Sequence, residues 1–80
     1  MLAYVYTLEE LKNLFNGKIE VINKTTIRMG DLYITEEEAT YLGSIVQVKK
    51  EELENWRYLE IWSGNEKILA TIPIKFIKVL

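Results

Sequence analysis

Residues 56–72, WRYLEIWSGNEKILATI, carry the clearest structural pattern in this sequence. Side chains alternate along 56–62 and again along 67–72, which is the period of two expected of β-strands. Between these runs, Ser63-Gly64-Asn65-Glu66 has the composition of a tight turn. The stretch therefore predicts an antiparallel hairpin. Pro73 cannot donate a ladder hydrogen bond, so it should end the second strand or lie on a sheet edge.

Further strands are expected on both sides of this hairpin. Residues 74–80 should finish the fold, and 2–6 and 44–48 are short and β-prone, with a charged loop or distorted helical turn over 49–55. A period of two also runs through 19–29, where a turn at Asn23-Lys24 would place four apolar residues on one face: Ile19, Val21, Ile27 and Met29. The chain should therefore be mostly β.

An N-terminal helix is predicted over 8–15. Thr7 and Glu10 have the spacing of a capping box, in which each side chain accepts a hydrogen bond from the other's backbone N–H. Apolar residues then repeat at helical spacing and should face the core: Leu8, Leu11, Leu14 and Phe15. Asn16-Gly17 should end the helix in a left-handed cap.

A second, shorter helical turn should follow Thr35, because Thr35 and Glu38 have the spacing of another capping box. This helical turn should end at Gly43. Three glutamates, Glu36 to Glu38, occupy its first turn, where negative charge is favourable. They could also indicate a cation site. We favour the capping interpretation, because carboxylates in hard-metal loops converge, whereas consecutive helical residues diverge.

Composition narrows the functional classes. Eighty residues, 49% of them hydrophobic, suffice for one small domain spanning 1–80. The chain has no cysteine and no histidine, which excludes thiolate nucleophiles, disulfides, imidazole bases and the usual zinc ligands. Ser44 and Ser63 thus lack an activating imidazole, and no spacing singles out a glutamate pair such as Glu20 and Glu60. We expect no enzyme activity, no cofactor and no metal.

Charge bears on partners and location. A net charge of -2 and a pI near 5.1 disfavour binding to phosphate backbones, although 67–80 contains three lysines and no acid. The preference for lysine and glutamate is typical of thermophiles and equally of an AT-rich genome. The longest apolar run, 1–6, is too short to span a bilayer, and no signal peptide follows it. A cytoplasmic protein without membrane attachment is expected.

The ending TIPIKFIKVL resembles the close of Src-homology-3 (SH3) domains, in which an apolar residue and proline precede a short helical turn with an aromatic and then a final strand. Ile72, Pro73, Phe76, Ile77 and Leu80 match that order. TIRMGDLYI is similar to the family's diverging turn, and AYVY to its N-terminal tyrosine motif. The resemblance implies an SH3-like small β-barrel. It also implies a groove for proline-rich peptide, lined by Tyr4, Tyr6, Trp56, Pro73 and Phe76. The helix predicted over 8–15 departs from the family, which has an irregular loop there.

The sequence therefore predicts an α+β, mostly β domain: a small SH3-like barrel or bent antiparallel sheet with an N-terminal helix and a second short helical turn. We expect a non-catalytic protein-interaction or accessory module that self-associates or docks onto a larger complex through exposed aromatics and a sheet edge. The residues expected to bind the partner are Trp56, Tyr58, Trp62, Pro73, Lys75 and Phe76.

The alternative is a small nucleic-acid-binding β-barrel. In it, Lys75, Phe76 and Lys78 would form a basic-aromatic platform for single strands. The competing interpretation of these lysines is an edge strand protected by charge against aggregation.

Overall fold

A computed structural model describes residues 1–23, 26–55 and 57–80. In chain order its elements are β1 (Leu2–Val5), α1 (Leu8–Phe15), β2 (Ile19–Val21), β3 (Ile27–Met29), β4 (Leu32–Ile34), α2 (Glu36–Ala39), β5 (Ile45–Gln47), α3 (Glu52–Asn55), β6 (Tyr58–Ser63), β7 (Glu66–Pro73), the 3-10 turn η1 (Ile74–Phe76) and β8 (Ile77–Val79).

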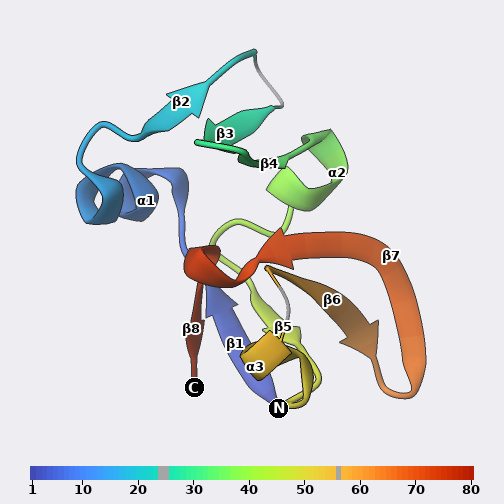
Figure 1. The fold of residues 1–80 in the computed structure, drawn as a ribbon. Coiled ribbons are helices and arrows are strands. Elements are labelled where there is room, and N and C mark those ends of the chain that lie inside the picture. The colour runs from blue at the N-terminus through green and yellow to red at the C-terminus, as the bar shows by residue number, and fades with distance from the viewer. Residues whose placement is uncertain (24–25, 56) are drawn as a thin grey trace.

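The strands form two antiparallel sheets. One has five strands in the order β7-β6-β5-β1-β8, and the other has three in the order β2-β3-β4. Figure 1 shows β1, β5 and β8 in the lower part of the view and the three-stranded sheet above them, with α1 and α2 at its two ends. The prediction of a mostly β, antiparallel fold with an N-terminal helix is confirmed. The described strands do not close into one barrel, because β7 and β8 lie at opposite edges of the larger sheet.

The predicted hairpin is confirmed as β6–β7, with Ser63 paired to Glu66 across the turn. Pro73 ends β7 and pairs with Tyr58, and the next N–H, that of Ile74, donates to the Arg57 carbonyl at 2.9 Å. Since inward and outward hydrogen bonds alternate along an antiparallel strand, the Pro73 nitrogen lies on the side away from β6. An edge strand therefore accommodates this proline without losing a ladder bond, as predicted.

Helix α1 forms with the predicted capping box. The Glu10 N–H donates to the Thr7 hydroxyl at 3.2 Å, and the Thr7 N–H donates to the Glu10 carboxylate at 3.0 Å. The helix ends as predicted, although Asn16, at φ 44°, is itself the left-handed cap residue ahead of Gly17. The predicted apolar face is wrong at Leu14, which is 56% exposed while Leu11 is fully buried. Leu14 lies beside the buried face, at its border with solvent.

The second predicted helical turn forms as α2, without the predicted capping box. No side chain caps its backbone; the Thr35 hydroxyl donates to the Glu38 carboxylate instead. The helix ends at Ala39, and further turn residues continue to Gly43. Gly43 has φ 81°, and a Cβ there would lie 3.2 Å from the Thr7 side chain, so glycine suits both the backbone and the space.

Helix α3, in the charged segment before the hairpin, supplies a hydrogen-bond acceptor to β6 where β5 does not pair with it. Strand β5 is short and pairs with β6 only between Gln47 and Trp62. Further along β6, the Glu60 N–H donates to the Glu52 carboxylate of α3 at 3.0 Å. The distorted helical turn predicted here therefore satisfies one backbone N–H of this interior strand, where an unpaired N–H would be costly.

The smaller sheet keeps the predicted apolar face only in part. Ile19 pairs with Met29 and Val21 with Ile27. Ile19 and Ile27 are buried, Met29 is half-buried, and Val21, at the strand end, is 47% exposed. The predicted turn at Asn23-Lys24 includes Lys24, which lies outside the described residues.

Two polar contacts fasten the sheets together around a shared core. The Tyr33 N–H of β4 donates to the Tyr58 hydroxyl at 3.2 Å, and Arg57 forms an ion pair with Asp31. Buried residues from both sheets, α1 and η1 form one apolar cluster: Ala3, Val5, Leu11, Ile19, Ile27, Ile34, Val46, Val48, Leu59, Ile61, Ala70, Ile72 and Phe76. Each sheet therefore buries one face against the other elements.

Candidate protein-interaction surface

The five described residues among the six predicted to bind a partner do not share one surface. Trp56 lies outside the described residues. Tyr58 and Trp62 are half-buried on β6, and the Tyr58 hydroxyl is occupied by the bond to β4. Lys75 is exposed on η1, whereas Pro73 and Phe76 are buried. The side chains of these last two residues offer a partner no surface in this conformation.

Phe76 belongs to the core. Its side chain is 0% exposed, and its ring lies 6.3 Å from that of Phe15 on α1. The platform considered for single-stranded nucleic acid is not assembled, because its aromatic member is inaccessible. Its two lysines also lie on different elements. Lys75 is on η1 and borders a hollow beside α1, whereas Lys78 is on β8 and pairs with Tyr4 of β1.

Trp62 occupies an outward position on β6. The Lys49 ammonium lies 4.5 Å from the centre of its ring, a distance suited to a cation–π contact. Its indole Nε1 is buried and has no hydrogen-bond partner among the described residues. The neighbouring Gln47 exchanges two hydrogen bonds with the backbone of Gly64, which fixes the hairpin turn beside the indole.

Cross-strand pairing collects apolar side chains on the outward face of the five-stranded sheet. Leu2 pairs with Gln47, which in turn pairs with Trp62, while Tyr4 pairs with Ile45. On the other side of β1, the Leu80 N–H donates to the Leu2 carbonyl at 3.1 Å. Because side chains alternate along a strand, these paired side chains lie on the outward face of the sheet, and the buried Ala3 and Val5 lie on the inward face. We define the outer patch as Leu2, Tyr4, Ile45, Trp62 and Leu80.

The outer patch is exposed at its aliphatic members. Leu2 is 54%, Ile45 61% and Leu80 62% exposed. Met1 and Val79, at 42% and 43% exposed, lie on the other face of the sheet, because they pair with the buried Val48 and Ala3. Among the described residues, three of the six large apolar side chains that are more than half exposed therefore lie on this one face. Contiguous apolar surface of this kind commonly marks an interaction site.

Charges of both signs surround the outer patch. On β6 and β7, the Lys67 ammonium lies 3.3 Å from the Glu60 carboxylate. On the other side, the Tyr4 hydroxyl donates to the Glu10 carboxylate. That bond, the Thr7 N–H and the nearby Lys78 lower the pKa of Glu10 below its usual value, and the same bond raises the pKa of Tyr4. The rim is thus mixed rather than uniformly basic.

Acidification should weaken the fold through Glu10. Because the folded-state pKa of Glu10 lies below its unfolded value, the carboxylate contributes stability above the unfolded pKa, and this is lost as pH falls through the folded pKa. Unfolding in urea, measured from neutral to acidic pH, should show the wild type losing its advantage over Glu10→Gln. Tyr4→Phe should move the pKa of Glu10, followed by carboxyl NMR, back towards its usual value. An unchanged pKa in Tyr4→Phe would show that this hydroxyl does not cause the shift.

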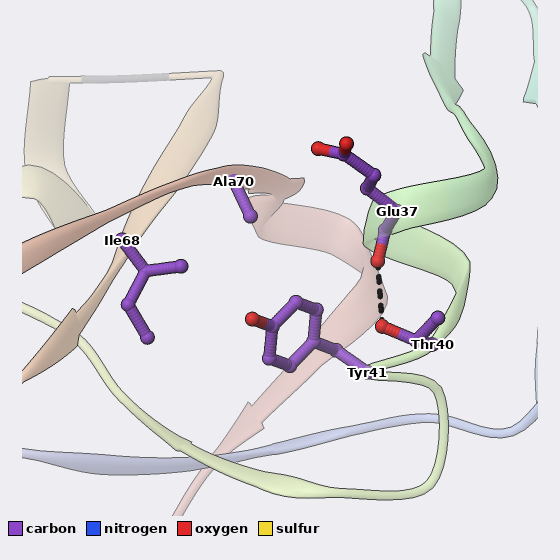
Figure 2. Close-up of a pocket in the computed structure, with 5 residues that line it drawn as sticks. All are labelled: Glu37, Thr40, Tyr41, Ile68 and Ala70. Carbon is purple, nitrogen blue, oxygen red and sulfur yellow. Dashed lines mark hydrogen bonds between the residues drawn. The ribbon is translucent and has the colours of Figure 1, made fainter.

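A separate hollow of about 310 Å³ lies between α2 and β7. Figure 2 shows the Tyr41 ring inside it, with the hydroxyl directed toward the side where Ile68 lies, and Glu37 and Thr40 on the α2 side. The Thr40 hydroxyl donates to the Glu37 carbonyl, which closes the end of the helix. These polar groups serve α2 itself, so the hollow adds no convergent polar set to the outer patch.

Neither a metal centre nor a membrane span is found in the described parts of the chain. Within 1–23, 26–55 and 57–80, no three acidic side chains are arranged to hold a metal ion. No helix among these residues is long and apolar enough to cross a bilayer. Comparison with protein families, curated proteins and solved structures gave no match to this chain.

Sequence reasoning found only part of the outer patch. The sequence predicts Trp62 as a binding residue because large aromatic side chains are typical of interface hot spots. Leu2 and Leu80 lie in the terminal segments that the sequence marks as apolar and β-prone. Ile45 was missed as a surface residue, because one apolar residue in a short strand looks the same whether it faces the core or solvent. Its pairing with Tyr4 places the Ile45 side chain on the outward face of the sheet.

Proposed function

We propose that this chain is a non-catalytic, cytoplasmic protein-interaction module whose binding surface is the outer patch. The observation that supports this most directly is the pairing of Leu2, Ile45 and Leu80 into neighbouring exposed positions on one sheet face. Association would remove these side chains from water, which is the main driving force for protein contacts. Trp62, at the edge of the patch, has the chemistry of an interface hot spot.

A second copy of the chain is the partner that we propose. An isologous interface brings one surface against itself, so a rim of one charge would repel its copy. Here Lys67 lies beside Glu60, and Lys78 lies near Glu10, so each sign can meet the other across a two-fold axis. A mixed rim around an apolar centre is the usual anatomy of such an interface.

Ile45→Glu should disrupt this association. The substitution places a charge at an exposed apolar position of the patch, beside Tyr4, and we expect the dimer affinity to fall at least about tenfold. Ile22→Glu is the matched control, since Ile22 is 54% exposed but lies after β2 on the smaller sheet. Light scattering after size exclusion, over a range of concentrations, should give a dimer for the wild type and Ile22→Glu and a monomer for Ile45→Glu.

Two outcomes would contradict the proposal. A wild-type protein that stays monomeric at the concentrations used for NMR would rule out self-association as its function. A monomer whose mass rises with a mixed oligonucleotide and falls back at high salt would favour the nucleic-acid-binding alternative, because phosphate contacts are lost as salt increases.

We also propose that the chain is a variant of the SH3-like fold, in which helix α1 stands where the family has an irregular loop. Support comes from the end of the chain, where buried Ile72 and Pro73 precede η1, the aromatic Phe76 and β8. An experimental structure in which β1 does not lie between β5 and β8 would contradict this proposal.

A further inference from the structure

A hollow of about 490 Å³ lies between α1, the three-stranded sheet and η1. Its apolar lining comes from Phe15, Met29 and Leu32, and the Phe15 ring lies against that of Phe76 in the core. Figure 1 shows α1, β2, β3 and η1 on one side of the molecule, and β1 and β8 extend away from them. The hollow is of the size that binds small molecules, which is roughly 300–1,000 Å³.

Four charged residues also line this hollow: Lys18, Glu20, Asp31 and Lys75. Each carboxylate already has an arginine partner outside it. The Glu20 carboxylate lies 3.0 Å from the Arg28 guanidinium, and Asp31 forms an ion pair with Arg57.

The two lysines differ from the carboxylates in this respect. Among the described residues, neither Lys18 nor Lys75 has a carboxylate within 4.0 Å of its ammonium. Each acid is paired with an arginine, and Lys75 also lies near enough to Asp31 to lower the pKa of that carboxyl. With the two arginines included, the hollow and its rim carry four positive and two negative charges beside an apolar floor. Its electrostatics therefore favour a negatively charged ligand.

We propose that this hollow binds a small amphipathic anion, whose carboxylate or phosphate group contacts Lys18 and Lys75 and whose apolar part packs on Phe15, Met29 and Leu32. The apolar contact supplies affinity, and the two ammonium groups select the sign of the head group. This site lies on different elements from the outer patch and does not depend on the proposed self-association.

Fluorescence of 8-anilinonaphthalene-1-sulfonate, itself an amphipathic anion, provides the first test. We expect saturable binding to the wild type and an affinity about tenfold lower for the double variant Lys18→Gln/Lys75→Gln. The matched control is Lys12→Gln/Lys50→Gln, which removes two exposed lysines outside the hollow and should bind like the wild type. Coincident urea transitions of the three proteins would show that the probe reports a folded site.

Competition then tests charge and head group separately. Octanoate or octyl phosphate should displace the probe, and whichever displaces it at the lower concentration identifies the preferred head group. Octyltrimethylammonium has the same chain with the opposite charge and should not compete. In amide NMR spectra, octanoate should shift Gly30 and Lys75 but not Leu2 and Ile45.

Three results would overturn the proposal. These are equal probe affinity in both double variants, equal displacement by the cationic and anionic amphiphiles, and NMR shifts confined to the outer patch. The last would transfer the apolar binding to the surface proposed for self-association. A monomeric wild type that still binds octanoate in the hollow would leave this inference standing and reject only the dimer.

Discussion

Phe76→Ala is expected to lower the free energy of unfolding by about 3–5 kcal/mol, because it removes a fully buried ring and leaves a cavity. The ring contacts the apolar cluster from η1 and lies beside Phe15, so the loss affects both α1 and the five-stranded sheet. Small domains are stable by only about 5–15 kcal/mol in total. The variant should therefore unfold at much lower urea concentration, or fail to fold at 37 °C.

Urea unfolding followed by circular dichroism measures this directly. Tyr33→Ala is the matched control, since Tyr33 is an aromatic residue that is 54% exposed, and its stability should change by no more than about 0.5 kcal/mol. Phe76→Leu should lose less than Phe76→Ala because it refills most of the cavity. If Phe76→Ala were as stable as Tyr33→Ala, Phe76 would be a surface residue, as the sequence alone indicated.

Leu11→Ala should cost about 2–5 kcal/mol, the second largest effect that we expect. Leu11 is the fully buried residue by which α1 joins the core. Leu14→Ala, in the same helix and of the same residue type, should change stability by no more than about 0.5 kcal/mol because Leu14 is 56% exposed. Alanine is the best helix former, so neither substitution weakens the helix itself.

The difference between these two variants isolates burial from helix propensity. Thermal or urea unfolding of both proteins, compared with the wild type, is sufficient. Similar losses in Leu11→Ala and Leu14→Ala would mean that α1 turns a wider face to the core than the structure shows. A loss in Leu14→Ala alone would mean that the helix is rotated about its axis.

Local signals determined most of the secondary structure. The Thr7–Glu10 box, the turn at Gly64-Asn65 and the ring of Pro73 each act within a few residues, so the sequence suffices to predict α1, the β6–β7 hairpin and the end of β7. The same box pattern at Thr35 predicted α2 but not its hydrogen bonds, because the Thr35 hydroxyl donates to the Glu38 carboxylate instead.

Tertiary structure alone decided which apolar residues are available to a partner. Phe76 and Ile45 both lie in short apolar segments, yet one is fully buried and the other is 61% exposed. Sequence periodicity defines two faces of a strand but not which of them meets the rest of the chain, since that depends on pairing between residues far apart. The pairing of β1 with both β5 and β8 joins residues from the start, middle and end of the chain. The outer patch exists only because of that pairing, whereas the helix, the hairpin and the absence of thiol and imidazole chemistry follow from the amino-acid sequence itself.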